Sequence, residues 1–172
     1  MTVNISARQF SDARLASDIQ DALRETGIDP SRLQLEPTES VAAADPKLSS
    51  TVMAHLKHMG IGVILDNFGS GAASLRALRE FPVDALKIDR SLIREMQTDR
   101  SASDMVEMII TLARKMNLRV IAEGIETVRQ FERLRELGCG FGQGYYFSQA
   151  LDAKVVVPFL QQNVGVSRGA GT

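Results

Sequence analysis

Oxygen-bearing side chains stand at the ends of several apolar, strand-like segments of this 172-residue chain. The first three such residues are Asn4, Glu36 and Asp66. Amide and carboxylate oxygens are the ligands that hard divalent cations prefer. In a parallel α/β protein the carboxyl ends of the strands share one face, so these side chains would converge there. An N-cap or a loop carboxylate would explain any one of them, and it is their joint placement that predicts a metal site.

Polar side chains also follow the three later strand-like segments. Lys87 and Asp89 flank a single residue, so on one extended strand both would point to the same face, as a catalytic pair or equally as a buried ion pair. Glu123 and Glu126 come after an apolar run and before a helix, where a carboxylate is also favoured by the helix dipole. Gln143 ends the last segment. These residues predict a polar pocket beside the metal site.

Residues 67–71, Asn-Phe-Gly-Ser-Gly, form a glycine-rich loop directly after Asp66. Such a loop can bring backbone amides close to an anionic ligand, although alone it is weak evidence. His55 and His58 are three apart on a predicted helix and are interpreted as surface residues. The single cysteine, Cys139, excludes an intrachain disulfide and is interpreted as a small apolar residue ahead of the last strand.

Strand-like and helix-like patterns alternate along the chain, which is typical of consecutive βα units. Helices are expected from a cap at Ser11 or Asp12 to Gly27, from Asp45 to Gly60, over 103–116 and over 127–137. The order favours an open doubly wound sheet or part of an eight-stranded barrel, since a whole barrel needs about 200 to 250 residues. The strands are expected near 2–5, 33–36, 61–66, 85–89, 118–123 and 143–147.

Composition restricts the class of protein. A hydrophobic content of 44% with 24% charged residues is typical of a globular domain. The formal net charge of −1 provides no basic field for polymeric DNA or RNA. No stretch approaches 18 apolar residues and the N-terminus has no leader pattern, so no membrane segment and a cytoplasmic location are expected.

Six segments resemble, in order and spacing, the motifs of the EAL domain, the bacterial phosphodiesterase and receptor module for cyclic di-GMP. They are VNISARQF (3–10), LEPTES (35–40), LDNFGSG (65–71), FPVDALKIDR (81–90), VIAEGIET (120–127) and GCGFGQGYYFSQAL (138–151). The resemblance implies an α/β fold, a partial TIM-like barrel whose six βα units correspond to strands 3 to 8 of the EAL barrel. It implies an EAL-like domain over 1–160 that lacks the first two strands, followed by a flexible tail over 161–172.

The resemblance also implies roles for individual residues in two-metal hydrolysis of cyclic di-GMP to pGpG, with Mg²⁺ or Mn²⁺. Metal ligands would be Asn4, Glu36, Asp66 and, in the position of the family's second aspartate, Asn67. Catalytic residues that hold or activate the attacking water would be Lys87, Asp89 and Glu123. Residues supporting the loop or the pocket would be Glu39, Glu126, Gln143, Gly69 and Gly71.

Three departures from the family pattern predict weak or absent activity. The Glu-Ala-Leu glutamate is not among the 172 residues, the Asp-Asp pair reads Asp66–Asn67, and the Thr-Gly-Tyr-Ser loop sequence reads Ser70-Gly71-Ala72-Ala73. A neutral amide is a poorer ligand for a hard dication, so an impaired metal site is expected. The alternatives are a degenerate receptor for cyclic di-GMP, a protein-interaction module, or an unrelated metal-dependent hydrolase. Open strand edges further predict a homodimer or larger assembly, and fused or separate sensory or GGDEF-type domains remain open.

Overall fold

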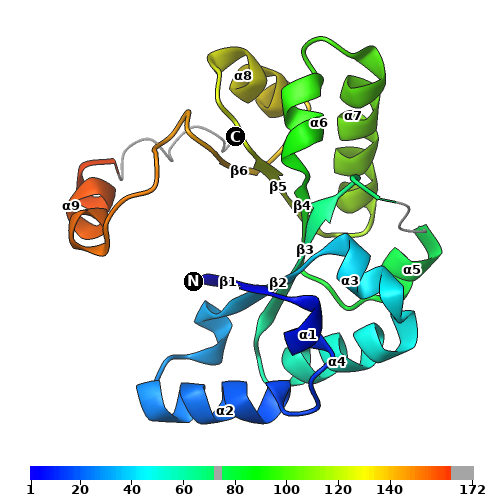
Figure 1. Cartoon of the computed structure of the whole chain (residues 1–172). Coiled ribbons are helices and arrows are strands. Elements are labelled where there is room, and N and C mark those ends of the chain that lie inside the picture. Colours follow the sequence, from blue (N-terminus) through cyan, green and yellow to red (C-terminus); the bar gives the residue numbers. More distant parts are fainter. Residues whose placement is uncertain (72–74, 164–172) are drawn as a thin grey trace.

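Six parallel strands alternating with helices make up the fold of this chain (Figure 1), seen in a computed structural model that describes residues 1–71 and 75–163. Each strand pairs in parallel with the next one in sequence, so all six carboxyl ends lie along one face. The sheet curls into part of a barrel, which confirms the predicted α/β, partial TIM-like fold of six βα units. The strands are β1 (Thr2–Ile5), β2 (Gln34–Pro37), β3 (Gly62–Phe68), β4 (Ala85–Ile88), β5 (Arg119–Glu123) and β6 (Phe141–Gln143).

Helices cover the outside of the curled sheet (Figure 1). In that view α2 and α4 lie on the side of β1 to β3, and α6, α7 and α8 lie on the side of β4 to β6, whereas α9 lies apart from the sheet. A short 3-10 turn spans Pro30–Arg32. The helices are α1 (Ala7–Phe10), α2 (Leu15–Thr26), α3 (Glu39–Ala44), α4 (Pro46–His58), α5 (Leu75–Glu80), α6 (Arg90–Glu95), α7 (Arg100–Lys115), α8 (Val128–Glu136) and α9 (Ala153–Asn163).

The central strands β3 and β4 are buried on both of their faces. Ile64 and Leu65 occupy successive positions of β3 and are both buried, as are the successive Ala85 and Leu86 of β4. Continuous apolar runs of this kind are typical of parallel strands covered on both sides. The resulting rigid centre holds the ends of β3 and β4 at fixed positions.

Local sequence signals set the helix ends as predicted in two cases. Asp45 caps α4 by accepting from the amide of Leu48, and Pro46 stands in the first turn. Thr127 caps α8 in a reciprocal capping box with Gln130. His55 and His58 are exposed on α4, as expected, and Cys139 is partly buried against the core.

Two local predictions were wrong. The last strand is Phe141–Gln143 rather than 143–147, because the chain turns at Gly144, whose carbonyl accepts from the amide of Phe147. The cap of α2 is Arg14 rather than Ser11 or Asp12, because the Asp12 carboxylate binds the backbone amide and guanidinium of Arg14 instead.

Two further predictions fall at the margins of the description. Residues 161–163 complete α9, and the rest of the expected tail, 164–172, lies outside the described residues. The loop positions Ala72 and Ala73 also lie outside them. Within the segments 1–71 and 75–163, no helix combines the length and the apolar character needed to cross a bilayer.

Candidate active site

Lys87 stands at the centre of a cluster of three carboxylates at the carboxyl ends of the strands. Its Nζ atom lies 2.9 Å from Oε2 of Glu36, 3.3 Å from Oε2 of Glu123 and 3.7 Å from Oδ1 of Asp66. The four side chains come from β2, β3, β4 and β5. Lys87, Glu36 and Asp66 are only 5%, 4% and 7% exposed. The fold therefore brings together four residues that are distant in sequence, as the strand-end pattern indicated.

Burial and charge act against each other in this cluster. Burial lowers the pKa of Lys87, but the hydrogen bond to Glu36 and the charges of all three acids outweigh it, so the pKa lies above its ordinary value. Burial raises the pKa of Asp66 above its ordinary value, and the nearby Lys87 only partly opposes this. The ammonium therefore supplies the positive charge that allows the carboxylates to be buried.

Asn4 lies on β1 directly beside Glu36 of β2, because the two residues are partners in the parallel register. Amide and carboxylate oxygens of Asn4, Glu36 and Asp66 are the donors that suit Mg²⁺ or Mn²⁺. Among the residues that the structure describes, however, no three His, Cys, Asp or Glu side chains are arranged so that they could hold a metal ion. These oxygen ligands are of the kind that a hard cation prefers, but the ammonium group of Lys87 lies between the carboxylates.

Asp66 and Asn67 lie in an irregularity of β3. The register with β4 shifts between Leu65 and Phe68, and Asn67 adopts a left-handed backbone with φ of 54°. The backbone amide of Asn67 donates to Oδ1 of Asp66 at 2.8 Å. Asparagine tolerates this conformation better than most residues other than glycine. The irregularity is a bulge within β3, whose pairing with β4 resumes at Phe68.

Glu39 anchors the glycine-rich loop that follows. It is 3% exposed, and its Oε2 accepts from the amide of Gly69 at 2.7 Å. Gly69 has φ of 93°, and a Cβ atom on Gly71 would lie 3.0 Å from Oε1 of Glu39. The positive φ therefore favours glycine at position 69, and a side chain at position 71 would press on the Glu39 carboxylate.

The segment from Glu123 to Glu126 is held by β6. The amides of Gly124 and Ile125 donate to the backbone carbonyl of Gln143 at 3.0 and 3.1 Å. The main chain of Gln143 therefore supports this loop. Ile125 is buried beneath it, whereas Glu126 is exposed.

Asp89 lies beyond the end of β4 and caps α6. Its carboxylate accepts from the amide of Ser91 at 2.7 Å and from the Ser91 hydroxyl. Among the described residues, Lys87 forms ion pairs with Glu36, Asp66 and Glu123. It does not pair with Asp89 there. The predicted strand boundary was wrong by one residue, because β4 ends at Ile88 and Asp89 is the N-cap of α6.

Gln130 is a buried residue at this site that the sequence interpretation missed. It lies on α8 and is 4% exposed. Its side chain accepts from the backbone amide of Glu126 and donates to the backbone carbonyl of Ile93 in α6. The signal was present as Thr127 followed three residues later by Gln130, the pattern of a capping box.

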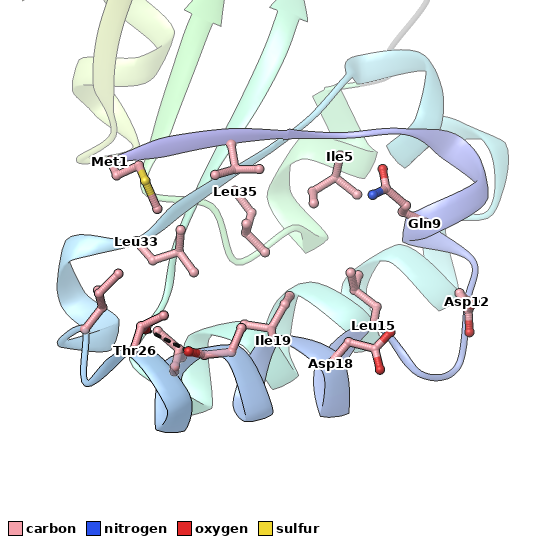
Figure 2. Close-up of a pocket in the computed structure, with 14 residues that line it drawn as sticks. Met1, Ile5, Gln9, Asp12, Leu15, Asp18, Ile19, Thr26, Leu33 and Leu35 are labelled. Carbon is pink, nitrogen blue, oxygen red and sulfur yellow. Dashed lines mark hydrogen bonds between the residues drawn. The ribbon is translucent and has the colours of Figure 1, made fainter. Parts of the chain in front are cut away.

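A separate apolar groove of about 400 Å³ lies between α2 and strands β1 and β2 (Figure 2). Ile5 of β1, Leu35 of β2 and Leu33, directly before β2, line it on one side, and Leu15 and Ile19 of α2 line it on the other. Successive side chains of a strand point to opposite faces, so Asn4 and Glu36 point away from this groove. It is distinct from the acidic cluster.

The parallel curled sheet and the cluster of acids around a buried lysine define the class of protein as an α/β barrel type with its site at the carboxyl ends of the strands. The chain belongs to the EAL domain family, whose model matches residues 1–150.

Known relatives agree with this assignment. The bifunctional diguanylate cyclase/cyclic di-GMP phosphodiesterase MucR of Pseudomonas aeruginosa is 40% identical over 154 residues, which are 90% of this chain and 22% of MucR. The chain thus spans about a fifth of the length of the curated relatives it matches.

Solved structures show the same fold. A MucR phosphodiesterase in complex with cyclic di-GMP superposes with a TM-score of 0.87 at 40% identity, covering 89% of this chain and 62% of that one. The EAL domain of Mycobacterium smegmatis DcpA gives a TM-score of 0.87 at 31% identity, covering 94% and 72%. Klebsiella pneumoniae BlrP1, solved with manganese and cyclic di-GMP, has a TM-score of 0.79 at 24% identity, covering 86% of this chain and 38% of that one, which shows the fold alone.

Proposed function

We propose that this chain forms the cyclic di-GMP site of an EAL domain in bacterial second-messenger signalling. The observation that supports it most is the convergence of Glu36, Asp66 and Glu123 around Lys87 at the carboxyl ends of four strands. Buried acids paired with a lysine at this face are typical of a site for a phosphate-bearing ligand and its cations. The relative MucR, a bifunctional diguanylate cyclase/cyclic di-GMP phosphodiesterase, supplies the ligand class.

The residues divide into three groups in this proposal. Asn4, Glu36 and Asp66 would hold Mg²⁺ or Mn²⁺, with Asn67 a weak further ligand. Bound divalent ions supply the charge that stabilises a phosphodiester displacement and acidify a bound water. Lys87, Asp89 and Glu123 would orient the attacking water and the phosphate. Glu39, Gly69 and Gly71 would fix the loop, and Glu126 and Gln143 would complete the pocket.

We further propose that the 172 residues alone hydrolyse cyclic di-GMP weakly or not at all. Asn67 offers an amide where the family has a carboxylate, and the family's Glu-Ala-Leu glutamate is not among these 172 residues. Both features reduce the attraction for divalent cations. Purified chain incubated with cyclic di-GMP and Mg²⁺ or Mn²⁺, followed by chromatography of pGpG, tests this. Turnover near about 1 per second, within the usual enzyme range, would contradict it.

A receptor without hydrolysis is the second candidate. It is favoured by the same ammonium, because Lys87 lies between the acids in the structure and can pair with a ligand phosphate without a metal ion. Titration of cyclic di-GMP in excess EDTA distinguishes the candidates. Binding that persists without divalent ions supports a receptor, and binding that requires them supports the metal-dependent site.

Self-association is a separate proposal for this chain. Within residues 1–71 and 75–163, the end strands β1 and β6 each pair on one side only, and Val3 and Phe141 are exposed on them. Unpaired strand edges promote association. Light scattering after size exclusion should show a dimer or larger species that Val3→Lys weakens, while Val128→Lys on exposed α8 does not. A wild-type monomer would contradict the proposal.

A further inference from the structure

We propose that Gln130 is a positioning residue, which fixes the carboxylate of Glu123 relative to Lys87 by tying the loop after β5 to α6. Its importance for ligand binding rests on the proposed function. The hydrogen bonds that define its positioning role do not depend on that proposal.

Gln130 uses both ends of its side-chain amide. Oε1 accepts from the backbone amides of Glu126 and Thr127 at 2.8 and 2.9 Å. Nε2 donates to the backbone carbonyl of Ile93 in α6 at 3.1 Å. A capping box alone would need only the bond to Thr127 and is compatible with an exposed side chain. Gln130 is instead 4% exposed and joins two elements.

The loop that Gln130 holds is packed directly against the start of α6. Gly124 has φ of 79°, and a Cβ atom there would lie 2.8 Å from Cβ of Arg90, the first residue of α6. The helix is thus contacted at Arg90 by the loop and at Ile93 by Gln130. It begins three residues after Lys87, and the loop begins directly after Glu123. The two contacts therefore connect the strand end that carries the ammonium to the one that carries the acid.

Glu123 has the least buried side chain of the three acids, although β6 also holds the backbone beneath it. Its side chain is 29% exposed, compared with 5% for Glu36, and lies at the outer side of the cluster. A partly exposed carboxylate keeps its place only as well as the backbone beneath it is held. Because Gln130 binds the amides at the far end of this loop, its loss should allow Glu123 to move away from Lys87.

The test compares Gln130→Met with Gln97→Met in the full chain. Gln97 directly follows the C-cap of α6 and donates to the Thr127 hydroxyl at 3.2 Å from an exposed position, so it contacts the same cap without binding the loop amides of Glu126 and Thr127. Two signals are recorded by NMR: amide exchange at Glu126 and Thr127, and the Nζ resonance of Lys87. Glu123→Gln gives the reference position of that resonance when the ion pair is removed.

Gln130→Met should accelerate exchange at both amides at least tenfold and shift the Lys87 resonance toward that of Glu123→Gln. Gln97→Met should change neither. Gln130→Glu keeps the two acceptor contacts, so it should preserve amide protection while losing the tie to Ile93 and shifting Lys87 partway. It also serves if Gln130→Met fails to fold. An unmoved Lys87 resonance in a folded Gln130 variant would overturn the inference.

Titration with cyclic di-GMP then separates this inference from the proposed function. A wild-type chain that binds no cyclic di-GMP contradicts the proposed function, and the NMR signals still decide the role of Gln130. If the wild type binds, Gln130→Met should weaken binding about tenfold and Gln97→Met should not. Equal binding by both variants would show that Gln130 does not position the site.

Discussion

Nζ of Lys87 lies 2.9 Å from Oε2 of Glu36, and the two side chains are only 6% and 5% exposed. They come from β4 and β2, which lie on either side of β3. Asp66 reaches the same ammonium from β3, so three adjacent strands contribute to a single charge cluster. Stability and ligand binding therefore depend on the same atoms.

Replacing Lys87 by methionine should destabilise the chain by about 3 to 5 kcal/mol, because it leaves buried carboxylates without a counter-charge. Urea unfolding followed by circular dichroism measures this. Lys57→Met is the control, since Lys57 pairs with Asp84 at a side chain that is 37% exposed. A surface pair of that kind contributes about 0 to 1 kcal/mol. Equal losses in the two variants would contradict the assignment of a buried counter-ion.

Asp66 should make the metal-free fold less stable as the pH rises. Its pKa in the folded chain is raised above the ordinary 3.8, so the folded state favours the protonated form. Its contribution to stability is fully present below pH 3.8 and is lost as the pH rises through the higher folded pKa. Asp66→Asn should remove this part of the pH dependence and stabilise the chain at neutral pH without metal. Unfolding curves measured in EDTA from acid to neutral pH check this, and an unchanged pH dependence would contradict it.

Gly144 should not tolerate a side chain. A Cβ atom there would lie 2.1 Å from the carbonyl oxygen of Ile125, so the backbone itself would have to move. Gly144→Ala should cost about 3 kcal/mol, the upper end of the usual range for overpacking. Gly140→Ala is the matched control on the other side of β6, because a Cβ atom there meets nothing within 4 Å. Thermal unfolding of both variants is the measurement, and a Gly144 variant as stable as the Gly140 variant would show that the turn is loose.

Asn67→Asp should increase hydrolysis of cyclic di-GMP in any longer protein that contains this chain. A carboxylate replaces an amide beside Asp66 and so strengthens the attraction for a dication. The left-handed backbone at this position, with φ of 54°, is accessible to aspartate as well as asparagine. Release of pGpG is compared at several Mn²⁺ concentrations. A rate that does not change would mean that the amide is tolerated.

Much of the fold was predictable from local sequence signals, because apolar runs, glycine stops and caps act over short distances. Asp45 with Pro46, and Thr127 at the start of α8, are examples. Convergence of Glu36, Asp66, Lys87 and Glu123 followed from the strand-end pattern. The capping role of Asp89 did not follow from that pattern, because it depends on a hydrogen bond from the Ser91 hydroxyl to the Asp89 carboxylate at the start of α6. The bridging role of Gln130 depends on the packing of α8 against α6, which no local pattern specifies.

The most direct test of the account is a calorimetric titration of the chain with cyclic di-GMP in Mg²⁺, comparing wild type, Glu36→Gln and Glu107→Gln. Glu36 lies in the buried cluster, whereas the Glu107 side chain is 57% exposed on α7 and pairs with Arg133. The account predicts that the wild type and Glu107→Gln bind equally and that Glu36→Gln loses at least tenfold in affinity. Absence of binding by the wild type, or equal binding by all three, would contradict a cyclic di-GMP site at the carboxyl ends of these strands.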